Sequence, residues 1–214
     1  MGGPALQKAK RPKPSIRAGR ELAILEAAES VFAELGFKGA TTGEIALRAG
    51  IPKANLHYYF PTKEALYREL MERILTAWLA AAASFDASDD PSEALTRYIS
   101  AKMDLSRAMP LGSRIWASEI MRGAPVIEDF LETKLKLWIE ARSAVIRRWT
   151  ASGKLIKIEP KVLFYMIWAT TQHYADFAAQ IAVLNGGAPL DDAQFASAKR
   201  DVARILVRGV VRAR

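Results

Sequence analysis

Residues 166–177, MIWATTQHYADF, contain several polar side chains within an otherwise apolar stretch of helical period. A buried polar group without a partner costs roughly 1–3 kcal/mol, so these side chains need a role. At about 100° per residue, Trp168, Gln172 and Asp176 fall on one side of such a helix. A tryptophan ring one turn from a primary amide offers a flat stacking surface beside a donor and an acceptor. The pair predicts a pocket for a flat ring with C=O and N–H groups on its rim.

The same segment also has plainer interpretations. An apolar helix of this kind can be plain core, or it can form a dimer interface in which polar side chains pair across a two-fold axis. We assign His173, on the opposite side of the helix, to the interface or the core. An earlier helix contributes Trp78 as a second wall of the pocket. The candidate ligand-binding residues are Trp78, Tyr165, Trp168, Gln172 and Asp176.

The sequence favours a binding protein over an enzyme. It has no cysteine, which excludes disulfides, thiolate metal sites and a cysteine nucleophile. The two histidines, His57 and His173, lie in separate segments without partners at metal-ligand spacing. We find no nucleophile elbow, no phosphate-binding glycine loop and no dinucleotide fingerprint. We therefore expect no catalytic residues, no metal and no cofactor.

The elements that must position these residues are helices. Almost every segment after residue 18 has helical period, and none alternates convincingly with a period of two. Breakers that contain glycine and proline divide the chain into about nine helices, so the predicted fold class is all-α. We expect a basic disordered arm over residues 1–18, a three-helix domain over 19–65 and a helical body over 66–214. The last two helices should cover about residues 160–184 and 191–212.

Two short helices joined by a tight turn are predicted in IALRAGIPKANLHYYF, residues 45–60. Thr41 and Glu44 have capping-box spacing, and Gly50 permits the turn of a helix-turn-helix. Leu56 and Phe60 form the inward side of the second helix and leave polar and small side chains outward. Asparagine bonds to adenine, lysine reaches guanine or phosphate, and alanine contacts a thymine methyl. This outward side predicts insertion into a DNA major groove, and a small helical bundle without DNA contacts is the alternative.

Charge is distributed unevenly along the chain. The net charge is +8, and residues 1–20 contain six bases and no acid. Such an arm solubilises a protein or follows DNA phosphates. The amino-terminal sequence lacks the charged and then apolar pattern of a signal peptide, and the longest near-apolar run, AWLAAAASF, is too short to cross a bilayer. We expect a soluble, cytoplasmic protein without membrane contacts.

The segment TTGEIALRAGIPKANLHYYFPTKEALYRELM resembles the DNA-binding head of the TetR family of one-component transcriptional regulators. The family pattern is T-x-x-I-A-x-x-A-G-V-S-x-x-x-x-Y-x-Y-F-x-x-K-x-x-L, and the match spans roughly residues 20–70. The resemblance implies that the third helix enters the major groove and that a dimer reads a pseudo-palindromic double-stranded operator. One departure is His57, where the family commonly has tyrosine. The DNA contacts implied by position are Thr42, Gly43, Lys53, Ala54, Asn55, His57, Tyr59 and Lys63.

Segments of the helical body resemble the Rut-type regulators of pyrimidine utilisation within that family. The resemblance lies above all in FYMIWATTQHYADFA, and also in SGKL and ILTAWLAAAASF. It implies a uracil- or thymine-class effector, a homodimer formed through the last two helices, and a repressor that releases its operator when the effector binds. A regulator of the same family with an unrelated effector is the nearest alternative. A pyrimidine-metabolising enzyme and a helical scaffold whose head contacts protein are more distant alternatives.

Overall fold

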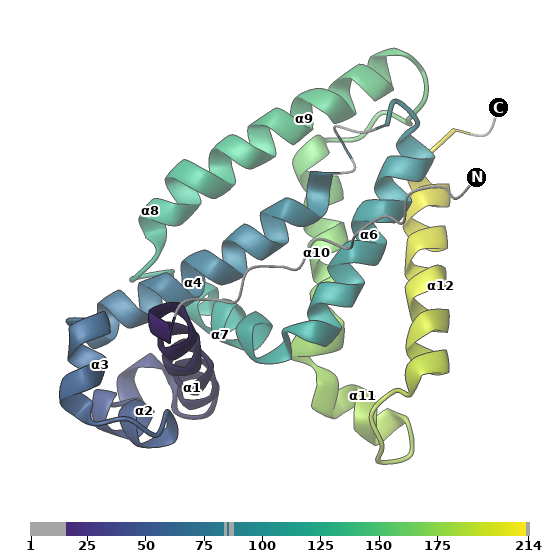
Figure 1. Cartoon of the computed structure of the whole chain (residues 1–214). Helices are drawn as coiled ribbons and strands as arrows, with labels where there is room; N and C mark the ends of the chain where they lie inside the picture. The colour runs from purple at the N-terminus through teal and green to yellow at the C-terminus, as the bar shows by residue number, and fades with distance from the viewer. Residues whose placement is uncertain (1–15, 84, 86–87, 213–214) are drawn as a thin grey trace, which may run out of the picture.

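The structure, a computed structural model, describes residues 16–83, 85 and 88–212. Every regular element within these ranges is a helix, and the only β pairing described there is an isolated bridge between Leu155 and Val211. The predicted all-α class is therefore confirmed. Figure 1 shows the amino-terminal helices grouped together next to a helical body formed by the rest of the chain. The predicted arm lies outside the described residues up to residue 15, but residues 16–18 already belong to the first helix, which begins at Ile16.

The head consists of α1 (Ile16–Gly39), α2 (Thr42–Arg48) and α3 (Lys53–Tyr59). The Thr41 hydroxyl accepts a hydrogen bond from the Glu44 N–H at 3.1 Å and so caps α2. The turn into α3 passes through Gly50 at φ 67°, in the left-handed region that glycine adopts at little cost. Leu56 and Phe60 are buried beneath α3. The predicted helix-turn-helix is confirmed.

The body begins with α4 (Lys63–Ala80), which follows the head directly. The Thr62 hydroxyl caps it by accepting from the Ala65 N–H at 3.0 Å. Figure 1 shows α10, α6 and α12 side by side, to the right of α4 in this view. The remaining elements are η1 (Ala81–Ala83), α6 (Pro91–Ala108), α7 (Pro110–Met121), α8 (Glu128–Phe130), the π-helical η2 (Leu131–Leu135), α9 (Lys136–Ala151), α10 (Pro160–Asp176), α11 (Ala178–Leu184) and α12 (Asp192–Val210).

Helix α4 belongs to both parts of the molecule. Its buried residues Leu66 and Leu70 share one hydrophobic cluster with α1, and Trp78 near its other end shares that cluster with Trp116 of α7. A second cluster joins α6, α9, α10 and α12. Because head and body share α4, a tilt of this helix moves the head relative to the body.

The helix predicted over about 160–184 is two helices. It ends at Asp176 and restarts at Ala178, because Phe177 has φ −113° and ψ 27°, outside the helical region. His173 stacks on Phe177 with ring centroids 4.8 Å apart. The last helix is present as α12. Several large apolar side chains of this region are exposed, among them Val162, Met166, Phe177, Val183, Leu184 and Ile205. No described helix has the length and apolarity that a bilayer span requires.

Candidate functional site

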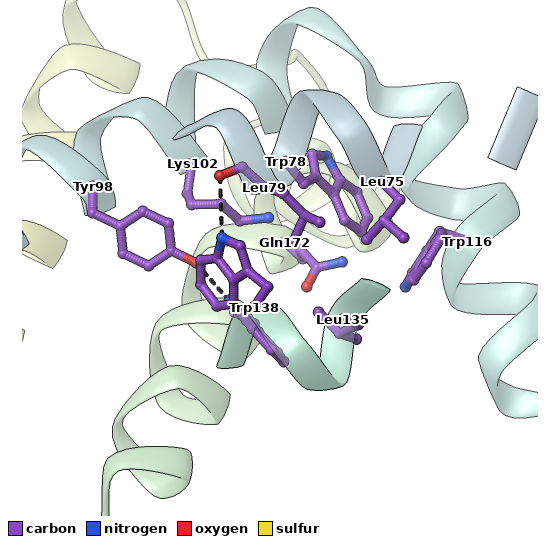
Figure 2. Close-up of a pocket in the computed structure, with 10 residues that line it drawn as sticks. Leu75, Trp78, Leu79, Tyr98, Lys102, Trp116, Leu135, Trp138 and Gln172 are labelled. Carbon is purple, nitrogen blue, oxygen red and sulfur yellow. Dashed lines mark hydrogen bonds between the residues drawn. The ribbon is translucent and has the colours of Figure 1, made fainter. Parts of the chain in front are cut away.

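A cavity of about 50 Å³ lies between α4, α6, α7, η2, α9 and α10. One water needs roughly 10–15 Å³ of such space, so the cavity has room for roughly three to five waters, the size of one small ring. Figure 2 shows that its walls are mainly aromatic and aliphatic. The lining residues are Leu75, Trp78, Leu79, Tyr98, Lys102, Trp116, Leu135, Trp138, Trp168 and Gln172.

Four of the ten residues that line the cavity are tryptophans. Trp78 and Trp116 meet edge to face with ring centroids 5.3 Å apart, and the centroids of Trp138 and Trp168 are 6.2 Å apart. The Trp168 indole N–H donates to the Tyr98 hydroxyl at 2.7 Å. Since that donor is satisfied within the protein, Trp168 offers a ligand its ring face rather than its N–H.

The structure brings three of the predicted ligand-binding residues together. Trp168 and Gln172 line the cavity from α10, and Trp78 lines it from α4. Gln172 is half-buried, and Figure 2 shows no hydrogen bond between its amide and the other lining residues. Its donor and its acceptor are therefore available to the edge of a bound ring.

Tyr165 and Asp176 do not line the cavity itself. They lie along a wider open groove that shares Trp168 and Gln172 with the cavity and so forms its mouth. Tyr165 is 54% exposed. The Asp176 carboxylate accepts a hydrogen bond from the Ser113 hydroxyl at 2.6 Å, which connects α10 to α7. Burial raises the pKa of Asp176, and the Ser113 hydrogen bond opposes that rise.

The cavity lining includes a buried lysine, Lys102, that the sequence did not lead us to predict as a site residue. Lys102 is 3% exposed, and its ammonium lies 4.1 Å from the centroid of the Trp78 ring. Burial lowers the pKa of Lys102 to about 7, and the charge of Asp176 acts in the opposite direction. The sequence did contain a signal, because Tyr98, Lys102 and Ser106 follow one another at helical spacing on the buried side of α6. A lysine on an apolar helical stripe indicates a buried charge.

The predicted DNA contacts gather on the head. Those on α3 are exposed apart from the half-buried Tyr59, while Thr42 and Gly43 are half-buried in the first turn of α2. Near the start of α1, the Arg17 guanidinium lies 5.8 Å from the ring centroid of Tyr58, an exposed residue of α3. The outward side of α3 is therefore polar and has a further cation beside it.

Two of the predicted DNA contacts already have partners in the protein. His57 Nδ1 lies 3.2 Å from the Pro61 carbonyl oxygen. A carbonyl only accepts, so Nδ1 bears the proton and Nε2 of the neutral ring is left as an acceptor. The Lys63 ammonium donates to the carbonyls of Phe37 and Ala40 at 2.7 and 2.9 Å. Lys63 thus joins α4 to the end of α1, and one of its three N–H donors remains for a phosphate.

Two family models together match residues 24–213. The model described as "Bacterial regulatory proteins, tetR family" matches residues 24–70, and the one described as "YcdC-like protein, C-terminal region" matches residues 71–213. The chain belongs to the TetR family. It is therefore a transcriptional regulator whose head is a DNA-binding helix-turn-helix.

Individual relatives agree with this family. The chain is 42% identical over 191 residues to the HTH-type transcriptional regulator RutR of Escherichia coli K12, covering 89% of this chain and 90% of that one. It is 27% identical to the regulator EthR of Mycolicibacterium smegmatis over 59% of each chain. The solved structure of the ketosteroid regulator KstR2 of Mycobacterium tuberculosis has the same fold, with a TM-score of 0.70 at 23% identity and coverage of 91% and 96%. Among the described residues there is no cluster of three or more side chains suited to hold a metal.

Proposed function

We propose that this TetR-family regulator is a homodimeric repressor that releases its operator when a pyrimidine such as uracil or thymine binds in the cavity. The observation that most supports this proposal is the joint lining of one small cavity by Trp78, Trp168 and Gln172. Aromatic faces stack on a flat ring, and an amide matches the alternating C=O and N–H groups on a pyrimidine rim. The resemblance of residues 164–178 to Rut-type regulators favours the same ligand class.

An unrelated effector is the second candidate. KstR2, which has the same fold, is a ketosteroid transcriptional regulator, so regulators of this fold are not confined to pyrimidines. The cavity of about 50 Å³ favours a single ring here, because a larger ligand has to spread into the open groove beyond Gln172. An enzyme that metabolises pyrimidines would need an activated nucleophile or a metal. In the cavity lining, the amine of Lys102 is the group with the lowered pKa that such a nucleophile requires.

In the proposed complex, α3 enters the major groove of the operator. Asn55 bonds to the edge of an adenine, Lys53 reaches a guanine or a phosphate, and Ala54 packs against a thymine methyl. In the dimer, exposed apolar side chains of α10 to α12, among them Met166 and Ile205, pack against those of a second copy. Two heads then read half-sites about 34–36 Å apart, or a multiple of that distance. The remaining contacts come from Thr42, Gly43, His57, Tyr59 and Lys63.

Helix α4 is the element that transmits effector binding to the head. Trp78 near its end lines the cavity, and Lys63 at its start binds carbonyls of the α1 end. One turn after Lys63 on α4, the Tyr67 hydroxyl donates to the buried Glu119 carboxylate of α7 at 3.2 Å. A ligand that binds one orientation of α4 better than another shifts the population toward it. The spacing of the two heads changes, and operator affinity falls.

Calorimetric titration of the purified protein with uracil and thymine tests the proposed function. We expect saturable binding, together with release of a labelled operator fragment by the same ligands. If neither pyrimidine binds, the proposed effector class is wrong, although family membership is unaffected. Consumption of uracil by the protein alone would favour the enzyme alternative.

A further inference from the structure

Lys102 is a buried cation without the partners that usually accompany a buried charge. Within the described part of the chain, no carboxylate oxygen lies within 4.0 Å of its ammonium. Among the described residues, Glu119 is also charged and buried, but its carboxylate has hydrogen-bond partners. Its carboxylate accepts hydrogen bonds from the Tyr67 hydroxyl, the Arg122 guanidinium at 2.8 Å and the Val126 N–H at 2.8 Å. Burial of an unpaired charge destabilises a folded protein. A ligand in the cavity would supply the hydrogen-bond acceptor that the Lys102 ammonium lacks.

The Lys102 side chain extends from α6 into the cavity, toward Trp78 and the space beside Gln172 (Figure 2). The ammonium rests against the face of Trp78, a contact that stabilises a cation but leaves its N–H donors without acceptors. Lys102 and Gln172 are thus two polar groups directed into one aromatic chamber. A ring that stacks on the tryptophans presents its edge to both.

The ionisable groups around Lys102 are few. Asp176 of α10 acts on it at long range and is bound to Ser113, with His173 and Arg114 near that carboxylate. On α6 the hydroxyl of Tyr98 accepts from an indole of the wall. The cavity residues of α4, α7, η2 and α9 are tryptophans and leucines, which do not titrate. The ammonium is therefore the one cationic group of the cavity lining.

We propose that Lys102 is an effector-binding residue whose ammonium donates a hydrogen bond to a ring oxygen of the ligand. This inference rests on the proposed function, and it specifies the ligand further as a ring with an oxygen conjugated to an acidic N–H. A more acidic N–H places a larger share of the ligand in the deprotonated form, whose negative charge is shared with the conjugated oxygen, and an anionic oxygen accepts a stronger charge-assisted hydrogen bond from the ammonium. Ring substituents that acidify the N–H, such as the fluorine of 5-fluorouracil, should therefore tighten binding.

Binding of this kind is linked to protons. Because the pKa of Lys102 is lowered to about 7, a large share of the free protein holds a neutral amine at about pH 8. An oxygen acceptor favours the ammonium, so the pKa of Lys102 rises in the complex. Each ligand bound at that pH then takes up a fraction of a proton from the buffer.

Calorimetry with uracil at about pH 8, in phosphate and in Tris, measures the proton uptake and the affinity together. For the wild-type protein we expect net uptake and tighter binding of 5-fluorouracil than of uracil. Lys102→Met should bind uracil at least ten-fold more weakly, without uptake and without preference for the fluorinated ring. Lys157→Met removes an exposed lysine outside the cavity and is the matched control, which should behave as wild type.

Undiminished uracil affinity in Lys102→Met would overturn the role of Lys102 and leave the proposed function intact. Failure of the wild-type protein to bind uracil would overturn both. Unchanged operator binding and helical content in Lys102→Met exclude misfolding as the cause of a loss. If that variant does not fold, the same titration is made with Lys102→Gln, which keeps a neutral N–H donor. Wild-type affinity of Lys102→Gln for uracil, without proton uptake, would contradict the proposal.

Discussion

The Trp168 indole N–H donates to the Tyr98 hydroxyl at 2.7 Å, and this bond fixes a wall of the cavity from the neighbouring helix. The two residues are 70 positions apart in the chain. Burial raises the pKa of Tyr98, so the phenol stays protonated at any physiological pH. The bond holds the Trp168 indole of α10 against α6, the helix that also contains Lys102.

Replacing Tyr98 with phenylalanine tests this bond. The variant leaves the Trp168 N–H without its acceptor, which costs roughly 1–3 kcal/mol of folding stability. We expect a stability loss of that order in urea denaturation and weaker uracil binding in calorimetry. Tyr58→Phe, in which the lost hydroxyl belongs to an exposed ring on the head, should change neither quantity. Equal behaviour of the two variants would contradict a role for the bond.

Trp168→Ala and Gln172→Ala separate effector binding from DNA binding. The first removes a stacking wall and the second removes the amide that meets the ring edge, so either should abolish uracil-dependent release of the operator. Operator affinity without uracil should stay near the wild-type value, because both residues are on α10, which packs against helices of the body and is not part of the head. A labelled-operator binding assay with and without uracil measures both. Persistence of release in both variants would refute the cavity as the effector site.

Asn55→Ala tests the reading of the operator. Loss of a bidentate contact to adenine costs about 1–3 kcal/mol of discrimination, so specific binding should fall by roughly ten- to a hundred-fold. Binding to unrelated DNA should barely change, because phosphate contacts supply that affinity. Asn55 is exposed, so circular dichroism should show an unchanged fold. Undiminished preference for the operator would exclude Asn55 as a base contact.

Lys102→Met should stabilise the protein in a pH-dependent manner. The pKa of Lys102 is about 7 in the folded state, against an ordinary value of 10.5, so between these values the unfolded chain binds more protons. Wild-type stability therefore gains from rising pH in this window, and the penalty of the buried charge is fully present below pH 7. The variant should gain roughly 1–4 kcal/mol near pH 6 and little near pH 10. Denaturant titrations at both values measure the difference, and a pH-independent gain would contradict the assigned cause.

Gly112→Ala tests the packing of α7 against α1 and α4. A Cβ at Gly112 would lie 3.0 Å from a Glu29 carboxylate oxygen and 3.1 Å from an Ile74 side-chain carbon. Overpacking of this kind costs typically 1–3 kcal/mol, so the thermal midpoint should fall. Gly209→Ala is the matched control, because a Cβ on this helical glycine meets no atom within 4 Å. That variant should gain roughly 0.5–1 kcal/mol from helix propensity.

The local features of the fold were determined by the sequence alone. Helical period, the Thr41 cap and the glycine at position 50 act within a few residues, so they predicted the all-α class and the helix-turn-helix correctly. The neighbouring positions of Trp168 and Gln172 follow from helix geometry for the same reason. Local rules were insufficient at Phe177, where the chain leaves α10 earlier than its apolar pattern indicates.

Only the tertiary structure decided which residues share the cavity. Trp116, Trp138 and Lys102 lie on three different helices, and no period along the chain relates them to Trp168. Asp176 shares a helical side with Trp168, yet its carboxylate binds Ser113 of α7 at the groove instead. Side-chain spacing fixes the neighbours on one helix, whereas the packing of helices against one another fixes which sides meet. That packing put a lysine against Trp78, in a chamber that the sequence indicated only from α10 and α4.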